Sequence, residues 1–145
     1  MKVVLQKVKT ANVKVNNEVV GEISKGILVF LGINNNDTEK EADWLINKII
    51  KLRIFEDENN KMNKSLIDIN GEILIISQFT LYGDCRKGLR PSFTEAAPPE
   101  KAKKLYNYFV NKMKETGIKI ETGIFQEHMD VSLINDGPVT MIIEK

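Results

Sequence analysis

Two stretches of apolar residues without polar interruption limit the folds available to this chain. They are "GILVFLGI" at residues 26–33 and the four apolar residues that follow Glu72 in "EILII", residues 72–76. A strand with one face in water alternates apolar and polar residues, and neither stretch does so. Each is therefore predicted to be a strand buried on both faces. Other parts of the chain must cover such strands on either side.

The segments before and between these strands change their hydrophobic period. "VVLQKV" at residues 3–8 alternates as a strand does, and "NVKVNNEVVGEIS" indicates two short strands around Asn16 and Asn17. Residues 34–52 switch to a helical period, with Leu45, Ile49 and Leu52 on one face. Thr38 and Glu41 have the spacing of a capping box at the start of this helix. Trp44 is expected in the core.

A second helix is expected after residue 98. Pro98 and Pro99 can open it, and Gly117 can end it. Its apolar stripe consists of Ala102, Leu105, Phe109 and Met113. The polar residues 55–71 are interpreted as a loop. Residues 82–99 form a long irregular stretch, and such stretches in compact domains are usually functional or disordered.

The order of strands, helix, strand, helix and strands predicts a mixed α/β (α+β) fold. A largely antiparallel sheet covered by two main helices fits this order, and the repeating βα units of a doubly wound fold are missing. The 145 residues predict a single domain, residues 1–145, with one core of ordinary size.

Composition excludes several classes of site. The chain has one cysteine, Cys85, and one histidine, His128, which together cannot form a disulfide or a Cys/His zinc cluster. No nucleotide-binding glycine motif or EF-hand spacing occurs. We therefore expect no cofactor and no metal. No apolar run approaches the ~20 residues that cross a bilayer, and no signal peptide is recognisable, so a cytoplasmic protein without a membrane partner is expected.

The charge distribution gives a weaker indication of a partner. The net charge is +1, so no overall field points to nucleic acid. Two of the three arginines, Arg86 and Arg90, lie in "CRKGLRPSF", and lysines 101, 103 and 104 follow. A local basic face for nucleic acid and a solvated lysine-rich helix both produce this pattern.

Polar side chains follow the second apolar run in "SQFTLYGD", residues 77–84. A strand that leaves the core and becomes polar can deliver Ser77, Gln78 and Thr80 to a site, although a strand end that meets solvent has the same pattern. No base lies beside Ser77 or Thr80 in the sequence to activate either hydroxyl. His128 is expected at the surface and Cys85 is expected to be an ordinary thiol.

"NDGPVT", residues 135–140, separates two segments that are expected to be strands. Proline cannot donate a ladder hydrogen bond, and Asp-Gly is a frequent hairpin signal. A bend in the chain is therefore expected at Gly137 and Pro138. The alternative is that this backbone belongs to a functional site.

Together, "SQFTLYGD" and "NDGPVT" resemble the two signature motifs of the D-aminoacyl-tRNA deacylases. The resemblance extends along the chain through "MKVVLQKVKTANVKV", "RKGLRPSFTEAAPPEKAKKLY" and "DVSLINDGPVT". It implies a barrel-like sheet, a homodimer, and hydrolysis of the ester between a D-amino acid and the 3′-terminal adenosine of tRNA. It also implies a cis Gly137–Pro138 peptide that enters the partner's pocket and excludes L-residues.

The resemblance assigns roles to individual residues. Ser77, Gln78, Phe79 and Thr80 would form the catalytic pocket, with water activated by the ribose hydroxyl or with Thr80 as nucleophile. Phe125 would stack on the terminal adenine and Met129 would line the same pocket. Lys7 stands where the family usually has an arginine that holds the Gly-Pro loop.

Exclusion by the Gly-Pro peptide leaves glycine unrejected, so glycyl-tRNA is expected to be a substrate too. Two alternatives remain open at this point. One is a non-catalytic tRNA-binding or interaction domain on the same fold. The other is a relative that edits an achiral or an L-amino acid.

Overall fold

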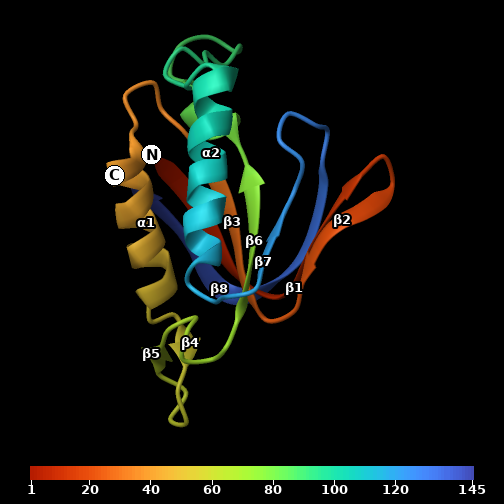
Figure 1. Ribbon diagram of the computed structural model, residues 1–145, viewed down its shortest axis with the longest axis vertical. Helices are drawn as coiled ribbons and strands as arrows, with labels where there is room; N and C mark the ends of the chain where they lie inside the picture. Colours follow the sequence, from red (N-terminus) through yellow and green to blue (C-terminus); the bar gives the residue numbers. More distant parts are fainter.

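The computed structural model describes all residues from 1 to 145 and consists of one main sheet, a small hairpin and two helices (Figure 1). The main sheet has the order β2-β1-β3-β6-β7, and β8 pairs with β1. Its strands are β1 (Lys2–Val15), β2 (Glu18–Ile23), β3 (Gly26–Gly32), β6 (Glu72–Ser77), β7 (Ile120–Thr122) and β8 (Asp130–Glu144). Residues 2–6 of β1 pair with β3 and with β8, so these two strands flank β1.

Antiparallel pairing dominates the sheet. β1 is antiparallel to β2, β3 and β8, whereas β3–β6 and β6–β7 are parallel pairs. The sheet curls until β2 lies against β7, and a Cβ added at Gly21 would lie 2.7 Å from the carbonyl oxygen of Thr122. Glycine allows this close approach of two backbones. The fold is therefore mixed α/β with a nearly closed, barrel-like sheet, as the sequence predicted.

The first hairpin follows from two asparagines. Asn16 and Asn17 join β1 to β2, and both have positive φ, 51° and 66°. Positive φ at both central residues is the geometry of a two-residue turn whose twist matches that of the strands, and asparagine tolerates it better than most residues. The expected pair of strands is confirmed, although the first of them is the end of the long β1.

The two helices lie side by side on one face of the sheet (Figure 1). Helix α1 (Glu39–Lys51) begins with the predicted capping box, in which Thr38 Oγ1 accepts from Lys40 N and Thr38 N donates to Glu41 Oε2. Helix α2 (Pro99–Lys114) has Pro99 at its first position, where no N–H is needed. Gly117, with φ of 79°, lies in the turn that follows α2.

The two apolar runs divide their side chains between two clusters of core residues. Ile73 and Ile75 of β6 pack beneath the helices, whereas Leu74 and Ile76 point into the smaller cluster inside the barrel. β3 does the same with Val29 on one side and Leu28 on the other. Burial on both faces is thereby confirmed, and it explains why residues 26–33 and 73–76 contain no polar side chain.

Three expectations were wrong. Residues 55–71 are not only loop, because β4 (Phe55–Glu56) and β5 (Met62–Lys64) form a short hairpin. Trp44 is 38% exposed and lies beside Lys48 and Lys145 rather than in the core. Residues 135–140 do not separate two strands, because β8 continues through them beside β1.

Neither helix has the length and apolarity that a bilayer crossing requires.

Candidate functional site

A pocket of about 740 Å³ opens where three walls meet. The first wall is the end of the parallel strands β3 and β6, with Leu31, Ile33, Ile76, Ser77, Gln78 and Phe79. The second is the approach to α2, with Phe93, Ala96, Ala97, Pro98, Pro99 and Ala102. The third is the β7–β8 connection, with Phe125, Gln126, Glu127, His128, Met129 and Val131. A mostly apolar hollow of this size with a few polar groups is typical of a small-molecule site.

The first wall is shaped by the way β6 ends. Gln78 N donates to Leu31 O at 2.8 Å, and a short 3₁₀ helix η1 (Phe79–Tyr82) then turns the chain away from the sheet. The backbone N–H groups of Phe79 and Thr80 stand at the start of this helix and donate to no loop or turn carbonyl. The first N–H groups of a helix have no internal acceptor, so both remain available to a ligand.

Thr80 lies next to the pocket but does not line it. Its Oγ1 accepts a hydrogen bond from Gln78 Nε2 at 2.5 Å, and no carboxylate, imidazole or amine is hydrogen-bonded to it. His128 reaches the pocket rim, where its side chain is 95% exposed and its Nε2 lies 3.6 Å from Asp130 Oδ1. The Thr80 hydroxyl therefore has no base in contact with it.

Phe125 and Met129 are brought together in the third wall. Phe125 is half-buried and packs against Tyr106, with ring centroids 5.7 Å apart. Tyr106 is fixed in turn, because its hydroxyl donates to Ile75 O at 2.9 Å. A Cβ at Gly123 would lie 2.3 Å from Met129 Sδ, so glycine leaves the space that Met129 occupies.

The second wall contains residues to which the sequence analysis gave no role. Phe93 makes an edge contact with Phe79 at a centroid distance of 5.1 Å, and Ala96 to Ala102 complete the wall. The length of the irregular segment 82–99 was the one signal that marked it as functional. Its small residues and prolines gave no further indication.

Gly137 and Pro138 lie on the "Gly-Pro bulge", by which we mean residues 136–139 of β8. Val8 pairs with Asn135 and Gln6 pairs with Thr140, so these four residues are left out of the ladder. The Gly137–Pro138 peptide is cis, and both residues are exposed. Asn135 closes the base of the bulge, because its Nδ2 donates to Lys7 O and to Val139 O.

Lys7 holds the Gly-Pro bulge from inside the protein. Its side chain is 1% exposed, and its Nζ lies 2.7 Å from Glu56 Oε1 and 3.2 Å from Asp136 Oδ2. Burial lowers the pKa of the Lys7 ammonium, but the hydrogen bonds to Glu56 and Asp136 outweigh it and raise the pKa overall. The hydrogen bond from Lys7 lowers the pKa of Glu56. One buried cation thus ties β1, the β4–β5 hairpin and the bulge together.

The predicted site residues fall into two groups. Ser77, Gln78, Phe79, Phe125 and Met129 line the pocket, and Thr80 adjoins it. Gly137, Pro138 and Lys7 do not line the pocket of the same chain. Glu56, Asn135 and Asp136 support the second group. Glu56 was not singled out from the sequence, because its contact with Lys7 joins segments that are distant along the chain.

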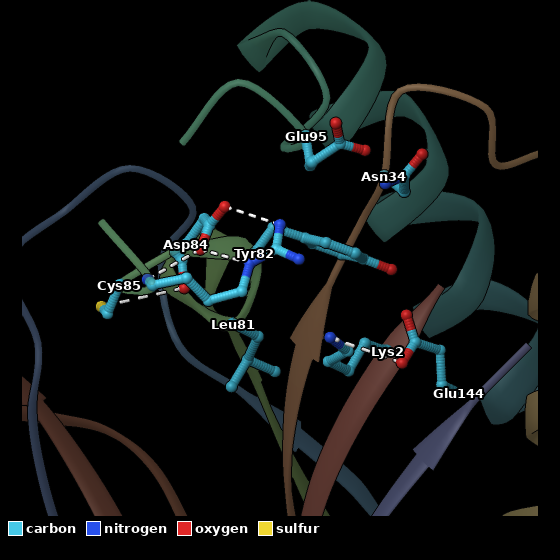
Figure 2. A pocket seen from close by; sticks show the side chains of 10 residues that line it. Lys2, Asn34, Leu81, Tyr82, Asp84, Cys85, Glu95 and Glu144 are labelled. Atoms are coloured by element: carbon cyan, nitrogen blue, oxygen red, sulfur yellow. Dashed lines mark hydrogen bonds and ion pairs between the residues drawn. The ribbon is translucent and has the colours of Figure 1, made fainter. Parts of the chain in front are cut away.

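A second hollow, of about 680 Å³, lies beside η1 (Figure 2). Four of its five charged side chains pair with one another, Arg86 with Asp84 and Lys2 with Glu144, and the fifth is Glu95. The hydrogen bond from Arg86 lowers the pKa of Asp84 to about 2. Tyr82 is buried there without a partner for its hydroxyl, and burial raises its pKa. No group of three or more His, Cys, Asp or Glu side chains is arranged to hold a metal ion.

Comparison with known proteins identifies relatives along the whole chain. The family model described as D-Tyr-tRNA(Tyr) deacylase matches residues 4–144. A protein named D-aminoacyl-tRNA deacylase from Thermosipho melanesiensis is 59% identical over 145 residues, which cover 99% of this chain and 97% of the relative. Another of the same name, from Desulfatibacillum aliphaticivorans, is 61% identical over 144 residues, which cover 99% of each.

Solved structures share the same fold. One described as c-Myc DNA Unwinding Element Binding Protein superimposes with a TM-score of 0.94 at 43% identity, covering 100% of this chain and 99% of the other. Another, described as a probable eukaryotic D-amino acid tRNA deacylase, has a TM-score of 0.87 at 18% identity, covering 98% of this chain and 97% of the other. The family match over nearly every residue and the close full-length relatives show that this chain belongs to the D-aminoacyl-tRNA deacylase family.

Proposed function

We propose that the protein hydrolyses the ester of D-aminoacyl-tRNA and releases the D-amino acid and tRNA. The observation that carries this proposal is the meeting of Ser77, Gln78 and Phe79 with Phe125 and Met129 in one pocket, from segments about 50 residues apart. The names of the close relatives support the same activity. Because its substrate would be aminoacylated tRNA, we place the protein in the cytoplasm.

In this proposal the 3′-terminal adenosine occupies the pocket. About 740 Å³ is enough for a nucleoside with an attached aminoacyl group. Phe125, supported by Tyr106, offers an aromatic face to the adenine, and Met129 fills the space beside it. Ser77 and Gln78 lie at the end of β6, where the ester would be held.

The chemical step needs a positioned water rather than an enzyme nucleophile. A water oxygen attacks the ester carbonyl carbon, the bond between that carbon and the ribose oxygen breaks, and the ribose oxygen recovers a proton. The neighbouring ribose hydroxyl can orient the water and relay that proton. The free N–H groups of Phe79 and Thr80 are suited to stabilise the oxyanion, and they belong to the backbone.

Replacement of Thr80 by alanine tests this chemistry. We expect Thr80→Ala to keep kcat for D-tyrosyl-tRNA within about tenfold of wild type, because it removes only the acceptor for Gln78 Nε2. A nucleophile lost from the reaction would leave background activity instead. Single-turnover hydrolysis of radiolabelled D-tyrosyl-tRNA measures the difference, with Thr80→Ser as the variant that retains a hydroxyl.

Rejection of L-residues is assigned to the Gly-Pro bulge of a partner subunit. Gly137 and Pro138 of the bulge are exposed and lie outside the pocket of their own chain, so they can act as a selector only in another copy. β8 pairs with β1 alone, and Ile134 (57% exposed) and Ile142 (71% exposed) stand on it. A long edge strand with exposed apolar side chains favours association, which supports a homodimer.

A panel of three substrates tests the proposed function. The protein is incubated with D-tyrosyl-, L-tyrosyl- and glycyl-tRNA, and release of the amino acid is followed. We expect cleavage of the D-ester and, more slowly, of the glycyl ester, since glycine has no side chain to exclude. Stable glycyl-tRNA at high enzyme concentration would contradict exclusion. Binding of tRNA without hydrolysis would favour the alternative of a non-catalytic domain, for which the neighbour named as a DNA-binding protein is a precedent in fold.

A further inference from the structure

The basic residues of this chain are concentrated in one segment next to the pocket. Residues 86–104 carry six basic and two acidic side chains, whereas the rest of the chain carries fifteen basic and eighteen acidic ones. The segment includes the irregular loop after η1 and the first turns of α2. The overall charge of +1 therefore conceals a local excess of positive charge.

This segment is also part of the pocket. Phe93 and the residues Ala96 to Pro99 form the second wall, and Ala102 continues it on α2. Lys103 follows Pro99 by four residues, which places both on the same side of the helix. The end of β6, the start of α2 and the β7–β8 connection meet at the same end of the molecule (Figure 1). The basic side chains therefore belong to the segment that forms the second wall, and none of them lines the interior of the pocket.

Four of the six basic side chains are unengaged. Arg86 pairs with Asp84 at 2.7 Å, and Lys101 Nζ donates to Asn35 O. Lys87, Arg90, Lys103 and Lys104 are exposed and form no ion pair or side-chain hydrogen bond. We call these four residues the basic rim. Their charges are available to an external anion.

We propose that the basic rim binds the phosphates of the tRNA acceptor end and so guides the 3′-terminal adenosine into the pocket. This proposal rests on the proposed function for the identity of the nucleic acid. A chain whose last nucleoside fills the pocket must leave through its mouth, so its preceding phosphates pass the rim. Phosphate contacts position a nucleic acid and contribute affinity that depends on salt, without reading its sequence.

The test compares a basic-rim variant with a matched control. The variant carries Lys87→Gln, Arg90→Gln, Lys103→Gln and Lys104→Gln, and glutamine is a good helix former, so α2 is retained. The control is Lys61→Gln, which removes an exposed, unpaired lysine from the β4–β5 connection at the opposite end of the molecule (Figure 1). Both are compared with wild type for binding of uncharged tRNA over a range of salt concentrations.

We expect the basic-rim variant to bind tRNA about tenfold more weakly at physiological salt, and the slope of log affinity against log salt to fall by about 2 to 3. The control should match wild type. Removal of the single-stranded 3′ end from the tRNA should abolish the difference between variant and wild type. An unchanged affinity and slope, or an equal loss in Lys61→Gln, would overturn the proposal.

Hydrolysis of 3′-O-D-tyrosyl-adenosine separates this proposal from the proposed function. This minimal ester has no phosphate to meet the rim, so the variant should cleave it at the wild-type rate while its KM for D-tyrosyl-tRNA rises about tenfold. An equal loss of activity on the minimal ester and on D-tyrosyl-tRNA would show that the basic rim does more than contact phosphates. A wild-type protein that binds tRNA through the rim but cleaves neither ester would contradict the proposed function and leave the rim proposal intact.

Discussion

Replacement of Gly137 by alanine is expected to lower kcat/KM for D-tyrosyl-tRNA by about a hundredfold, as small displacements in a reaction site can do. The same change should leave the subunit folded. A Cβ at Gly137 would meet only Asn135 Oδ1, at 3.8 Å, so the chain's own structure has room for it. Replacement of glycine where space and φ allow is neutral or slightly stabilising. If the added methyl group leaves its own subunit stable but lowers activity, it must contact another subunit or the substrate bound there.

Thermal unfolding and single-turnover kinetics measure the two effects separately. Ser132→Thr is the matched control, because it adds one methyl group at another exposed position of β8. It should leave both quantities unchanged. Full activity in Gly137→Ala would show that the Gly-Pro bulge is not part of the active site. A loss of stability that matches the loss of activity would show that the subunit has no room for a Cβ at residue 137.

Mixed dimers test whether the bulge acts across the interface. Gln78→Ala damages the pocket, and Gly137→Ala damages the bulge. In a mixed dimer formed from the two, one site combines both defects and the other combines an intact pocket with an intact partner bulge. Random mixing of the two inactive proteins should restore about a quarter of wild-type activity if the dimer is twofold symmetric. No recovery would mean that pocket and bulge work within one chain.

Lys7→Met should reduce the free energy of unfolding by about 2–3 kcal/mol at pH 7, because it leaves two carboxylates without their buried partner. Lys7 Nζ is the group that joins Glu56 and Asp136, and methionine keeps the unbranched stem of the side chain without its charged group. The bulge should lose its position too, so the preference for D- over L-tyrosyl-tRNA should weaken. Denaturant unfolding and the substrate panel measure the two results.

The stability effect has a defined dependence on pH. Glu56 has a pKa below its ordinary value of 4.5 in the folded protein, so the stabilisation is present above 4.5 and is lost as pH falls through the folded-state pKa. Lys7 has a raised pKa, so its contribution would decline only above 10.5. The difference between wild type and Lys7→Met should therefore be constant near neutrality and shrink in acid.

Two further variants test whether the stability loss in Lys7→Met comes from the missing buried charge. Lys7→Arg keeps the cation and should retain most of the stability and selectivity, since a guanidinium can contact both carboxylates. Lys64→Met removes the partner of Glu58, an ion pair at the surface that solvent screens, and should leave the free energy of unfolding almost unchanged. A loss in Lys64→Met as large as that in Lys7→Met would show that burial of the Lys7 pair is not the cause.

The sequence was a good guide wherever the relevant signal was local. Runs of apolar residues predicted β3 and β6, and the Thr38–Glu41 spacing predicted the start of α1. The motif "SQFT" predicted part of the first wall of the pocket, since Ser77, Gln78 and Phe79 lie at the end of a buried strand. Trp44 was misplaced because it borders the apolar face of α1, where a change of helix rotation decides between core and surface.

Residues 135–140 show the limit of local signals. Asp-Gly-Pro opposes regular pairing, so a bend between two strands was expected. In the structure β8 continues past it, because Gln6 and Val8 on β1 pair with residues on either side and the four extra residues form a bulge. Pairing with β1 along its length outweighs the local preference for a turn, and no local pattern reports that pairing.

The sequence by itself determined the fold class, the two buried strands, the helix starts and, through two motifs, the family. It also carried the residues of the pocket, because burial periods and motif residues are properties of contiguous segments. Only the tertiary structure decided that Lys7 is buried between Glu56 and Asp136, that Phe93 and α2 wall the pocket, and that the Gly-Pro bulge lies outside it. The contacts of Lys7 with Glu56 and with Asn135 join residues 49 and 128 positions apart along the chain, and such contacts form only when folding brings these segments together.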